Sequence, residues 1–271
     1  MMNEPEIAGR FPRTQQYAPE WISENGFGGH ALWQTEFLCE RLDLRPGMRV
    51  LDLGCGRAKS SVFLAREFGV EVWATDLWVA ASENWQRVRD AGMEDRVFPI
   101  HADARSLPFA AEFFDAIVAV DCYSYFGTDD LYLNYLVQFV KPGGQLGIAG
   151  AGLVQETPLP VPEHLREFWT HDLWCLHSAA WWRHHWERTG LVEITTADTM
   201  EDGWKLWLYW HRLNWSHNTT EIAALEADAG RYLNYNRLVA RRKTDVKLDE
   251  YAWPNELRLP YAYEKKAMLR E

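Results

Sequence analysis

The 271-residue sequence predicts an α/β fold, a doubly wound Rossmann-like sheet of seven mostly parallel strands with helices on both faces. Three observations indicate it. Short apolar runs typical of buried strands alternate with amphipathic stretches of about ten residues. The first clear strand runs into a glycine-rich turn, "VLDLGCG", and then into a helix. The following strands end in acidic residues. Strands separated by such helices pair in parallel, with right-handed crossovers.

The order of elements follows from this alternation. We expect strands at 49–54, 70–76, 96–103, 114–122 and 145–152, and helices at 31–44, 59–68, 81–92 and 130–140. A helix over 178–190 has Ser178 as its N-cap and Gly190 at its C-terminal end. Two further strands, 191–198 and 232–242, flank a Trp-rich helical insert at 201–229.

These elements define four segments of one domain. We expect N-terminal cap helices in 1–45, a nucleotide-binding core in 46–152, lid insertions and last strands in 153–243, and a C-terminal tail in 244–271. Many of the 15 tryptophans lie between Trp169 and Trp215. They indicate either bulky packing in a helical lid or an aromatic-walled pocket that holds a cation or excludes water.

Composition narrows the classes of partner. The net charge of -11 repels phosphate backbones and anionic membranes, so we expect neither nucleic acid nor membrane as a partner. The four cysteines form no C-x-x-C pair, and the polar N-terminus lacks an apolar leader, which favours the cytoplasm. No apolar run approaches the roughly 18 residues that cross a bilayer. We therefore expect a soluble monomer or homodimer.

The glycine turn is compatible with a dinucleotide or with S-adenosylmethionine. Gly54-Cys55-Gly56 departs from the G-x-G-x-x-G spacing that seats a pyrophosphate. Asp52 would repel a pyrophosphate but attract an α-amino group or a sulfonium. Asp76, at the end of the next strand, is placed to accept hydrogen bonds from a ribose diol, and Asp103 follows at the third strand end, within reach of an adenine amino group. These charges favour S-adenosylmethionine.

The motifs "VLDLGCG", "ATD", "HADARSLPF", "FDAIVAVDCYSYF" and "FVKPGGQLGI" resemble, in order and spacing, those of class I S-adenosylmethionine-dependent methyltransferases. The resemblance covers roughly residues 45–150. Within this superfamily the chain is similar to bacterial stand-alone small-molecule enzymes, the methyltransferase type 11 or cyclopropane-fatty-acid-synthase-like group. Residues 177–207 resemble their lid and late strands. The resemblance implies S-adenosyl-L-methionine as cofactor and S-adenosyl-L-homocysteine as product.

The resemblance also implies contacts with each part of the cofactor. The methionine part would lie near the glycine turn, the ribose near an acidic strand end, the adenine beside the next two loops, and the tip of the fourth strand would line the cofactor. The residues concerned are, in that order, Asp52, Gly54, Cys55 and Gly56; Asp76; Leu77, Trp78, Asp103 and Ala104; and Asp121 and Cys122. Many members have a third glycine where Ala58 stands, and a small residue still fits there.

The acceptor is expected beyond the carboxyl ends of the strands, roofed by the N-terminal segment and by the insert after the fifth strand. A protonated amine, a hydroxyl or a carbon acid needs a base, whereas a thiol does not. The candidate catalytic residues are Tyr125, His177 and Tyr123, and the candidate pocket residues are Tyr17, Trp21, His30 and His171.

The sequence thus predicts a methyltransferase acting on a small-molecule amine, thiol or hydroxyl by in-line displacement. Alternatives are cyclopropane-synthase-like lipid modification, a non-catalytic S-adenosylmethionine-binding regulator, and a dinucleotide-dependent reductase, which Asp52 opposes. No N/D-P-P-Y/F motif follows the fourth strand, which disfavours nucleobase amines and glutamine side chains as acceptors. The cluster His171, Asp172, Cys175 and His177 matches no common zinc spacing, so no metal is expected.

Overall fold

A computed structural model describes residues 4–24, 26, 28–246 and 248 of the chain. One sheet organises these residues, in the strand order β3-β2-β1-β4-β5-β7-β6. Neighbouring pairs from β3 to β5 are parallel, and β7 runs antiparallel to both β5 and β6. The predicted fold class is therefore confirmed. The strands are β1 Arg49–Leu53, β2 Glu71–Asp76, β3 Val97–His101, β4 Phe114–Val120, β5 Val140–Leu153, β6 Val192–Thr199 and β7 Leu233–Arg242.

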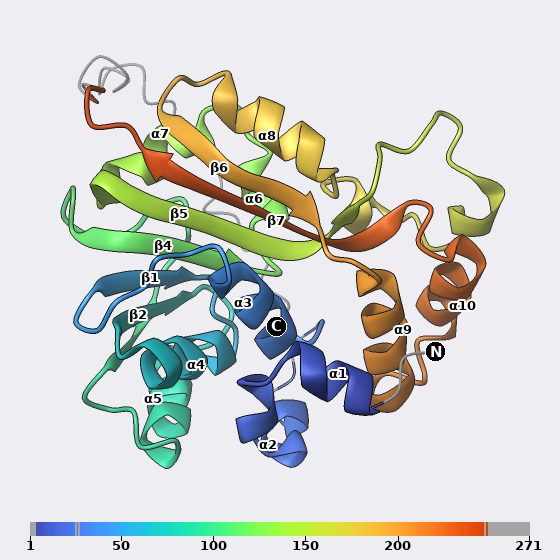
Figure 1. Cartoon of the computed structure of the whole chain (residues 1–271), viewed down its shortest axis with the longest axis horizontal. Coiled ribbons are helices and arrows are strands. Elements are labelled where there is room, and N and C mark those ends of the chain that lie inside the picture. Colours follow the sequence, from blue (N-terminus) through green and yellow to red (C-terminus); the bar gives the residue numbers. More distant parts are fainter. Residues whose placement is uncertain (1–3, 25, 27, 247, 249–271) are drawn as a thin grey trace.

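Helices cover both faces of the sheet (Figure 1). One face packs the apolar sides of α3, α4 and α5 against alternate strand residues such as Val50 and Val118. The other face packs α7 and α8 against the strand residues that point the opposite way, such as Leu51 and Ile117. The helices are α1 Glu4–Arg10, α2 Pro19–Glu24, α3 Ala31–Cys39, α4 Lys59–Phe68, α5 Ala81–Asp90, α6 Ser124–Gly127, α7 Tyr132–Leu136, α8 Ala179–Glu187, α9 Gly203–Asn214 and α10 Thr219–Asp228.

Three expected elements differ from those observed. The helix expected over 130–140 is the short α7 followed by a 3-10 turn at Val137–Phe139. β5 begins at Val140 rather than at 145, because an irregularity in its pairing with β4 accommodates the "KPGG" stretch within the strand. The insert at 201–229 divides into α9 and α10, because the Asn218 side chain accepts the backbone N–H of Glu221 and starts a new helix.

The α8 helix begins where its sequence predicts, after Ser178, but it ends at Glu187, three residues before Gly190. The Ser178 hydroxyl accepts the Trp181 backbone N–H at 3.2 Å, and Gly190 has the left-handed conformation that terminates helices. Trp182 and Trp186 are buried beneath this helix in the sheet core.

A second aromatic core joins the N-terminal helices to α9 and α10. Side chains of α1 and α2 pack with Trp207 and Trp210 of α9 and with Leu225 of α10. Figure 1 shows α1 and α2 lying beside α9. Bulky packing thus accounts for much of the tryptophan content, although Trp174 is largely exposed. No helix among the described residues is long and apolar enough to span a membrane.

Candidate functional site

The candidate site lies where β1, β2 and β4 end. These strands are parallel, so their carboxyl ends meet at one edge of the sheet. The turn after β1 holds the two glycines of the motif, and both have positive φ angles, +71° at Gly54 and +53° at Gly56. A Cβ atom on Gly54 would lie 2.5 Å from the sulfur of Cys122, which follows β4. The turn therefore needs glycine there, both for its conformation and for the close approach of the β4 loop.

Ala58 stands where many similar sequences have a third glycine. It has a left-handed conformation, with φ of +59°, and is fully buried at the start of α4. An alanine in this conformation costs roughly 1 kcal/mol. The small alanine side chain fits in the buried space at this position. Glycine would adopt the same left-handed conformation without this cost.

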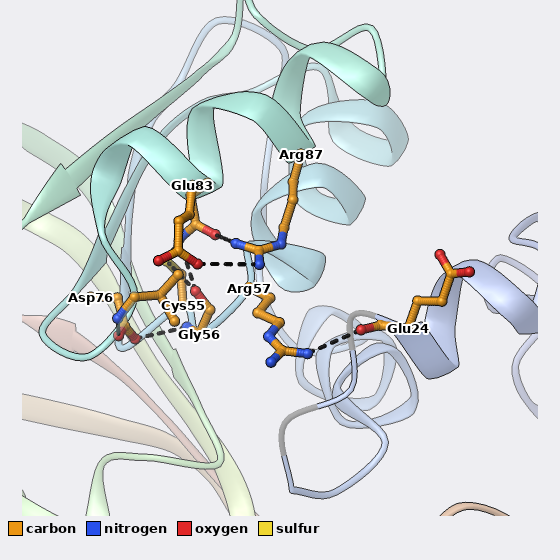
Figure 2. Close-up of polar contacts among 9 residues, drawn as sticks. Glu24, Cys55, Gly56, Arg57, Asp76, Glu83 and Arg87 are labelled. Carbon is orange, nitrogen blue, oxygen red and sulfur yellow. Dashed lines mark hydrogen bonds and ion pairs between the residues drawn. The ribbon is translucent and has the colours of Figure 1, made fainter. Parts of the chain in front are cut away.

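Asp76 holds the glycine turn from the end of β2. Its carboxylate accepts the backbone N–H of Gly56 at 2.8 Å and those of Trp78 and Val79 at 2.7 and 2.9 Å. The side-chain amide of Asn84, on α5, donates to the Gly56 carbonyl at 2.8 Å. Figure 2 shows Asp76 beside Gly56, with a dashed line for their hydrogen bond. Two neighbouring elements therefore fix its shape.

On its other side the turn contacts the N-terminal helices. The Arg57 guanidinium donates to the main-chain carbonyl of Glu24 at 3.1 Å (Figure 2). The Lys59 ammonium, almost fully buried, donates to the carbonyl of Ile22 at 3.1 Å. Burial and the Arg57 charge lower the pKa of Lys59 to about 8, although Asp121 acts to raise it. The last carbonyls of α2, which lack partners within their helix, thus receive two cationic donors.

Asp52 lies beneath the turn rather than in an open pocket. It is fully buried, and the hydroxyls of Ser60 and Ser61 both donate to one carboxyl oxygen at 2.6 Å. Burial raises the pKa of this carboxyl to about 6, although the two hydroxyls act to lower it. The observed contacts join β1 to the first turn of α4, and contact with a cofactor amino group stays a prediction.

The expected adenine-side residues lie around the ends of β2 and β3. Both carboxyl oxygens of Asp103 accept hydrogen bonds from the Arg105 guanidinium at 3.0 Å. The main-chain carbonyl of Ala104 also accepts a hydrogen bond, from the Tyr132 hydroxyl at 2.9 Å. Trp78 is 49% exposed at this edge.

Asp121, at the tip of β4, connects three segments. One carboxyl oxygen accepts the Ala151 backbone N–H at 3.0 Å, and the other accepts that of Gly29 at 3.1 Å. The indole N–H of Trp210, on α9, donates to the carbonyl of Gly28 at 3.1 Å. The N-terminal segment is therefore held over the β4 tip from two sides.

Buried polar groups that lack a hydrogen-bond partner within the described chain lie around Asp121. A Cβ atom on Gly29 would lie 2.6 Å from the Gln34 side-chain nitrogen, 2.9 Å from Asp121 Oδ2 and 3.3 Å from the Tyr235 hydroxyl. Both amide atoms of Gln34 and the hydroxyl of Tyr235 are buried and, within the described chain, have no hydrogen-bond partner. An unmet buried polar group costs about 1–3 kcal/mol. This cluster therefore points to a polar ligand.

Sequence reasoning missed Gln34 and Tyr235, since neither stands at a strand end. One signal was available for Gln34: a polar residue stands within a helix that is buried from Leu32 to Cys39. Such a helix has no solvent face to which a polar side chain could turn.

An acidic group of the lid lies near this cluster. The Glu221 carboxylate, on α10, accepts the Trp207 indole N–H at 2.7 Å, and its other oxygen lies 3.4 Å from His211 Nδ1. Burial raises the pKa of Glu221 to about 7, and the charge of Asp121 adds to this effect. Burial lowers the pKa of His211 to about 4. The lid therefore carries a carboxyl that titrates near neutral pH beside a neutral imidazole.

This shift predicts how stability depends on pH. Burial raises the pKa of Glu221 from its ordinary value of about 4.5 to about 7 in the folded protein, so the stability that its protonated form contributes is full at low pH and is lost as pH rises through 7. Between pH 5.5 and 8, the wild-type melting temperature should fall by roughly a few degrees more than that of Glu221→Gln. Thermal denaturation across this range measures the difference. Exposed Glu193→Gln is the control, and equal slopes for wild type and Glu221→Gln would contradict the prediction.

The expected pocket residues are not brought together. The Tyr17 hydroxyl donates to Glu67 at 3.1 Å, and its ring packs against Trp21 within the aromatic core. His30 caps α3 and stacks on Trp33, with ring centroids 3.7 Å apart. His171 is largely exposed on a short 3-10 turn. Only His30 adjoins the Gly28–Gly29 stretch above Asp121.

The three expected catalytic residues lie close to the tip of β4 and to α8. Tyr123 is buried, with its ring edge-on to Trp182 and Trp186, whereas Tyr125 is 50% exposed. Burial raises the pKa of both tyrosines, and the Asp121 charge adds to the effect on Tyr125. His177 Nδ1 lies 2.9 Å from a carboxyl oxygen of Glu156.

A pocket opens between the strand tips and α8. It is lined by residues that follow β4, by residues of β5 and β7, and by Trp182 of α8. The lining residues are Asp121, Cys122, Tyr123, Ser124, Ile148, Ala149, Gly150, Ala151, Trp182, Asn236, Arg237 and Leu238. Within the described residues, no group of three or more His, Cys, Asp or Glu side chains is arranged to hold a metal ion.

Comparisons with known proteins identify a methyltransferase domain. Residues 50–144 match the family model described as a methyltransferase domain. The methyltransferase GfsG of Streptomyces halstedii is 40% identical over 116 residues, which are 42% of this chain and 42% of that protein. The demethylmenaquinone methyltransferase of Corynebacterium efficiens is 34% identical over 128 residues, 45% of this chain and 50% of that protein. The chain thus matches about half the length of these relatives or less.

Solved structures share the fold across more of the chain. Phosphoethanolamine N-methyltransferase 2 of Haemonchus contortus, in complex with S-adenosyl-L-methionine, has a TM-score of 0.68 at 21% identity and covers 90% of this chain and 60% of its own. Geranyl diphosphate C-methyltransferase of Streptomyces coelicolor, in complex with Mg²⁺, geranyl diphosphate and S-adenosyl-L-homocysteine, has a TM-score of 0.64 at 20% identity. It covers 79% of this chain and 78% of its own.

Proposed function

We propose that this chain, whose residues 50–144 form a class I methyltransferase domain, transfers a methyl group from S-adenosylmethionine to a small-molecule acceptor and releases S-adenosylhomocysteine. The observation that carries the proposal is the glycine turn fixed by Asp76 next to the unmet polar groups around Asp121. The glycine turn provides a close-packed main chain. The polar groups around Asp121 provide hydrogen-bond donors and acceptors for the amino and carboxylate groups of S-adenosylmethionine.

The residues of this edge fit S-adenosylmethionine. Asp121, Gln34 and Tyr235 would hold the amino and carboxylate groups of the cofactor. The side-chain amide of Gln34 and the hydroxyl of Tyr235 have no hydrogen-bond partner among the described residues, so both could bind these groups. Asp76 has about four lone-pair positions and receives three backbone donors, so it retains capacity for a ribose hydroxyl. Leu77, Trp78, Asp103 and Ala104 would lie along the adenine.

The cofactor supplies an activated methyl group on a sulfonium. The protein's own residues must bind the acceptor in line with the bond that breaks, and must exclude water. The α9–α10 lid and the N-terminal helices provide the apolar cover, since their side chains form one buried core. The proposed acceptor group is an amine, a thiol or a hydroxyl.

The setting of the enzyme is also a proposal. The net charge of -11 supports a protein that binds neither nucleic acid nor a membrane. We also propose that it acts in the cytoplasm of a bacterium as a monomer or homodimer.

Calorimetric titration tests the cofactor first. The wild-type protein should bind S-adenosylmethionine and S-adenosylhomocysteine with micromolar affinity and show no heat with NAD or NADP at the same concentrations. A following assay measures transfer of labelled methyl to small amines, thiols and hydroxy compounds. Binding of NAD in place of the adenosyl ligands would refute the proposal. Adenosyl binding without transfer to any acceptor would favour a regulatory protein.

A further inference from the structure

We infer that Lys59 binds the carboxylate of the cofactor's methionine part, while Asp121 binds its amino group. The inference rests on the proposed function and deepens it, because it separates the two charges of the zwitterion and assigns one charged side chain to each. Lys59 is the first residue of α4, three positions after the second glycine of the turn. It is not among the residues that sequence reasoning assigns to the cofactor.

The Lys59 ammonium is a buried charge without a counter-ion. The residue is 3% exposed, and its one hydrogen bond within the described chain goes to the neutral carbonyl of Ile22 at 3.1 Å. No carboxylate of the described residues forms an ion pair with it. An ammonium carries three N–H donors, so two remain for a ligand. Because the desolvation of a charge is costly, buried charges in proteins are normally paired. This charge therefore indicates an anionic ligand.

Attachment of the α2 helix alone does not explain a lysine at this position. The carbonyl of Ile22 needs one donor, and a neutral side chain could provide it without burying a charge. Arg57 already binds the same helix through the carbonyl of Glu24. The positive charge of Lys59 is therefore the feature that a ligand role explains and that a structural role does not.

A chain of contacts connects Lys59 to the polar groups around Asp121. The Lys59 ammonium lies 5.9 Å from the centre of the Trp210 ring, and the indole N–H of Trp210 donates to the carbonyl of Gly28. The next residue, Gly29, donates its backbone N–H to Asp121. Lys59 and Asp121 therefore border the same short piece of main chain, one from the start of α4 and the other from the tip of β4.

The charges of Lys59 and Asp121 act on each other without forming an ion pair. Burial, with the charge of Arg57, lowers the pKa of Lys59 to about 8, and the charge of Asp121 acts to raise it. Lys59 is therefore mostly protonated near neutral pH. Asp121 receives one backbone N–H on each carboxyl oxygen, so it retains positions for an ammonium group. Two opposite charges that are near each other but separate match the amino and carboxylate groups that an α-amino acid carries on one carbon atom.

The neutral side chains of this cluster complete both halves of the site. Burial raises the pKa of Tyr235 well above its ordinary value, so its hydroxyl keeps its proton and can donate to a carboxylate. The amide of Gln34 has a carbonyl that can accept from an ammonium group and an NH₂ that can donate to a carboxylate. The carboxylate of the cofactor would thus receive donors from Lys59 and Tyr235, and its amino group would donate to Asp121 and Gln34.

Calorimetric titration with a pair of ligands at pH 7 tests the assignment. S-adenosylhomocysteine carries both groups, and its decarboxylated analogue, which is an amine, lacks only the carboxylate. The wild type should bind the analogue about 30-fold more weakly than S-adenosylhomocysteine. Lys59→Met keeps an unbranched side chain in the buried space but removes the charge. This variant should bind S-adenosylhomocysteine about 30-fold more weakly than the wild type does, and the analogue within about threefold of it.

Two further variants define what this result means. Asp121→Asn should weaken both ligands alike, because both retain the amino group. Lys141, near the start of β5, is paired with Asp115, so Lys141→Met is the matched control and should bind both ligands as the wild type does. An equal loss of both ligands in Lys59→Met would show that Lys59 acts only by holding α2, and would overturn the inference. Unchanged affinity of this variant for S-adenosylhomocysteine would also overturn it.

Nuclear magnetic resonance of protein labelled with ¹³C-lysine tests the same contact without any substitution. The Lys59 signal should titrate at a pH of about 8, apart from ordinary lysines near 10.4. Bound S-adenosylhomocysteine should raise this pKa above roughly 9, because a carboxylate favours the charged form, and the decarboxylated analogue should not raise it. The other groups that act on Lys59 are Asp121 and Arg57, and His30 stays neutral because burial and the Lys59 charge lower its pKa. No rise with S-adenosylhomocysteine bound would overturn the inference.

The same titrations distinguish failure of this inference from failure of the proposed function. A wild type that binds S-adenosylhomocysteine and its decarboxylated analogue equally well would overturn the inference and leave the proposed function standing. A wild type that binds neither S-adenosylmethionine nor S-adenosylhomocysteine would overturn the proposed function itself.

Discussion

Replacing Gly54 by alanine should lower the affinity for S-adenosylmethionine at least 100-fold. The new Cβ atom would lie 2.5 Å from the Cys122 sulfur and 2.9 Å from its Cβ, so the turn after β1 and the loop after β4 could not keep their present separation. The residue also has φ of +71°, a conformation that costs an alanine roughly 1–2 kcal/mol. Both effects act at the point where the cofactor would meet the main chain.

Gly190→Ala separates the two effects. Gly190 has nearly the same conformation, with φ of +72°, but nothing lies within 4 Å of its Cβ position. It should therefore lose about 1 kcal/mol of stability and no cofactor affinity. Titration calorimetry and thermal denaturation on both variants provide the comparison. Equal affinities for Gly54→Ala and wild type would show that the turn does not contact the cofactor.

Asp76→Ala should have a comparable effect, for a different reason. The change removes the acceptor of three backbone N–H groups, including that of Gly56, and leaves them unpaired at the cofactor edge. Hydrogen bonds to a charged group contribute about 1.5–3 kcal/mol each, although not additively. We expect a loss of at least 100-fold in affinity for both S-adenosylmethionine and S-adenosylhomocysteine, measured by calorimetry.

Asp90→Ala is the matched control, since Asp90 ends α5 on the surface and accepts only a side-chain hydrogen bond from Gln86 among the contacts of the described chain. It should bind as wild type does. If Asp76→Ala kept wild-type affinity, the ribose contact and the organising role of Asp76 would both be wrong.

The strands and the glycine turn could be predicted because their signals are local. Continuous apolar runs identify buried strands, and a glycine turn followed by a helix needs only adjacent residues. The early start of β5 could not be predicted in this way. "KPGG" is typical of a turn, and only the partner strand β4, with its irregular pairing, extends the strand through it.

The site was predictable where it follows strand ends and not elsewhere. Asp76 and Asp121 stand directly at such ends, so their convergence follows from the parallel sheet. Gln34 and Tyr235 come from two distant segments, and each is a single polar residue without a motif. Their meeting depends on how the lid and the N-terminal helices pack, which no local pattern encodes.

The way the N-terminal segment is attached decides which of its residues can be substituted. Arg57 and Lys59 bind carbonyl oxygens of Glu24 and Ile22, Trp210 binds the carbonyl of Gly28, and Asp121 binds the N–H of Gly29. Three of these partners are carbonyl oxygens, which every amino acid provides, and the fourth is a backbone N–H, which every amino acid other than proline provides. Positions 22 and 24 can therefore exchange their side chains while these two contacts are kept, whereas a Cβ atom at Gly29 would lie 2.6 Å from the Gln34 side-chain nitrogen, so this anchor requires glycine.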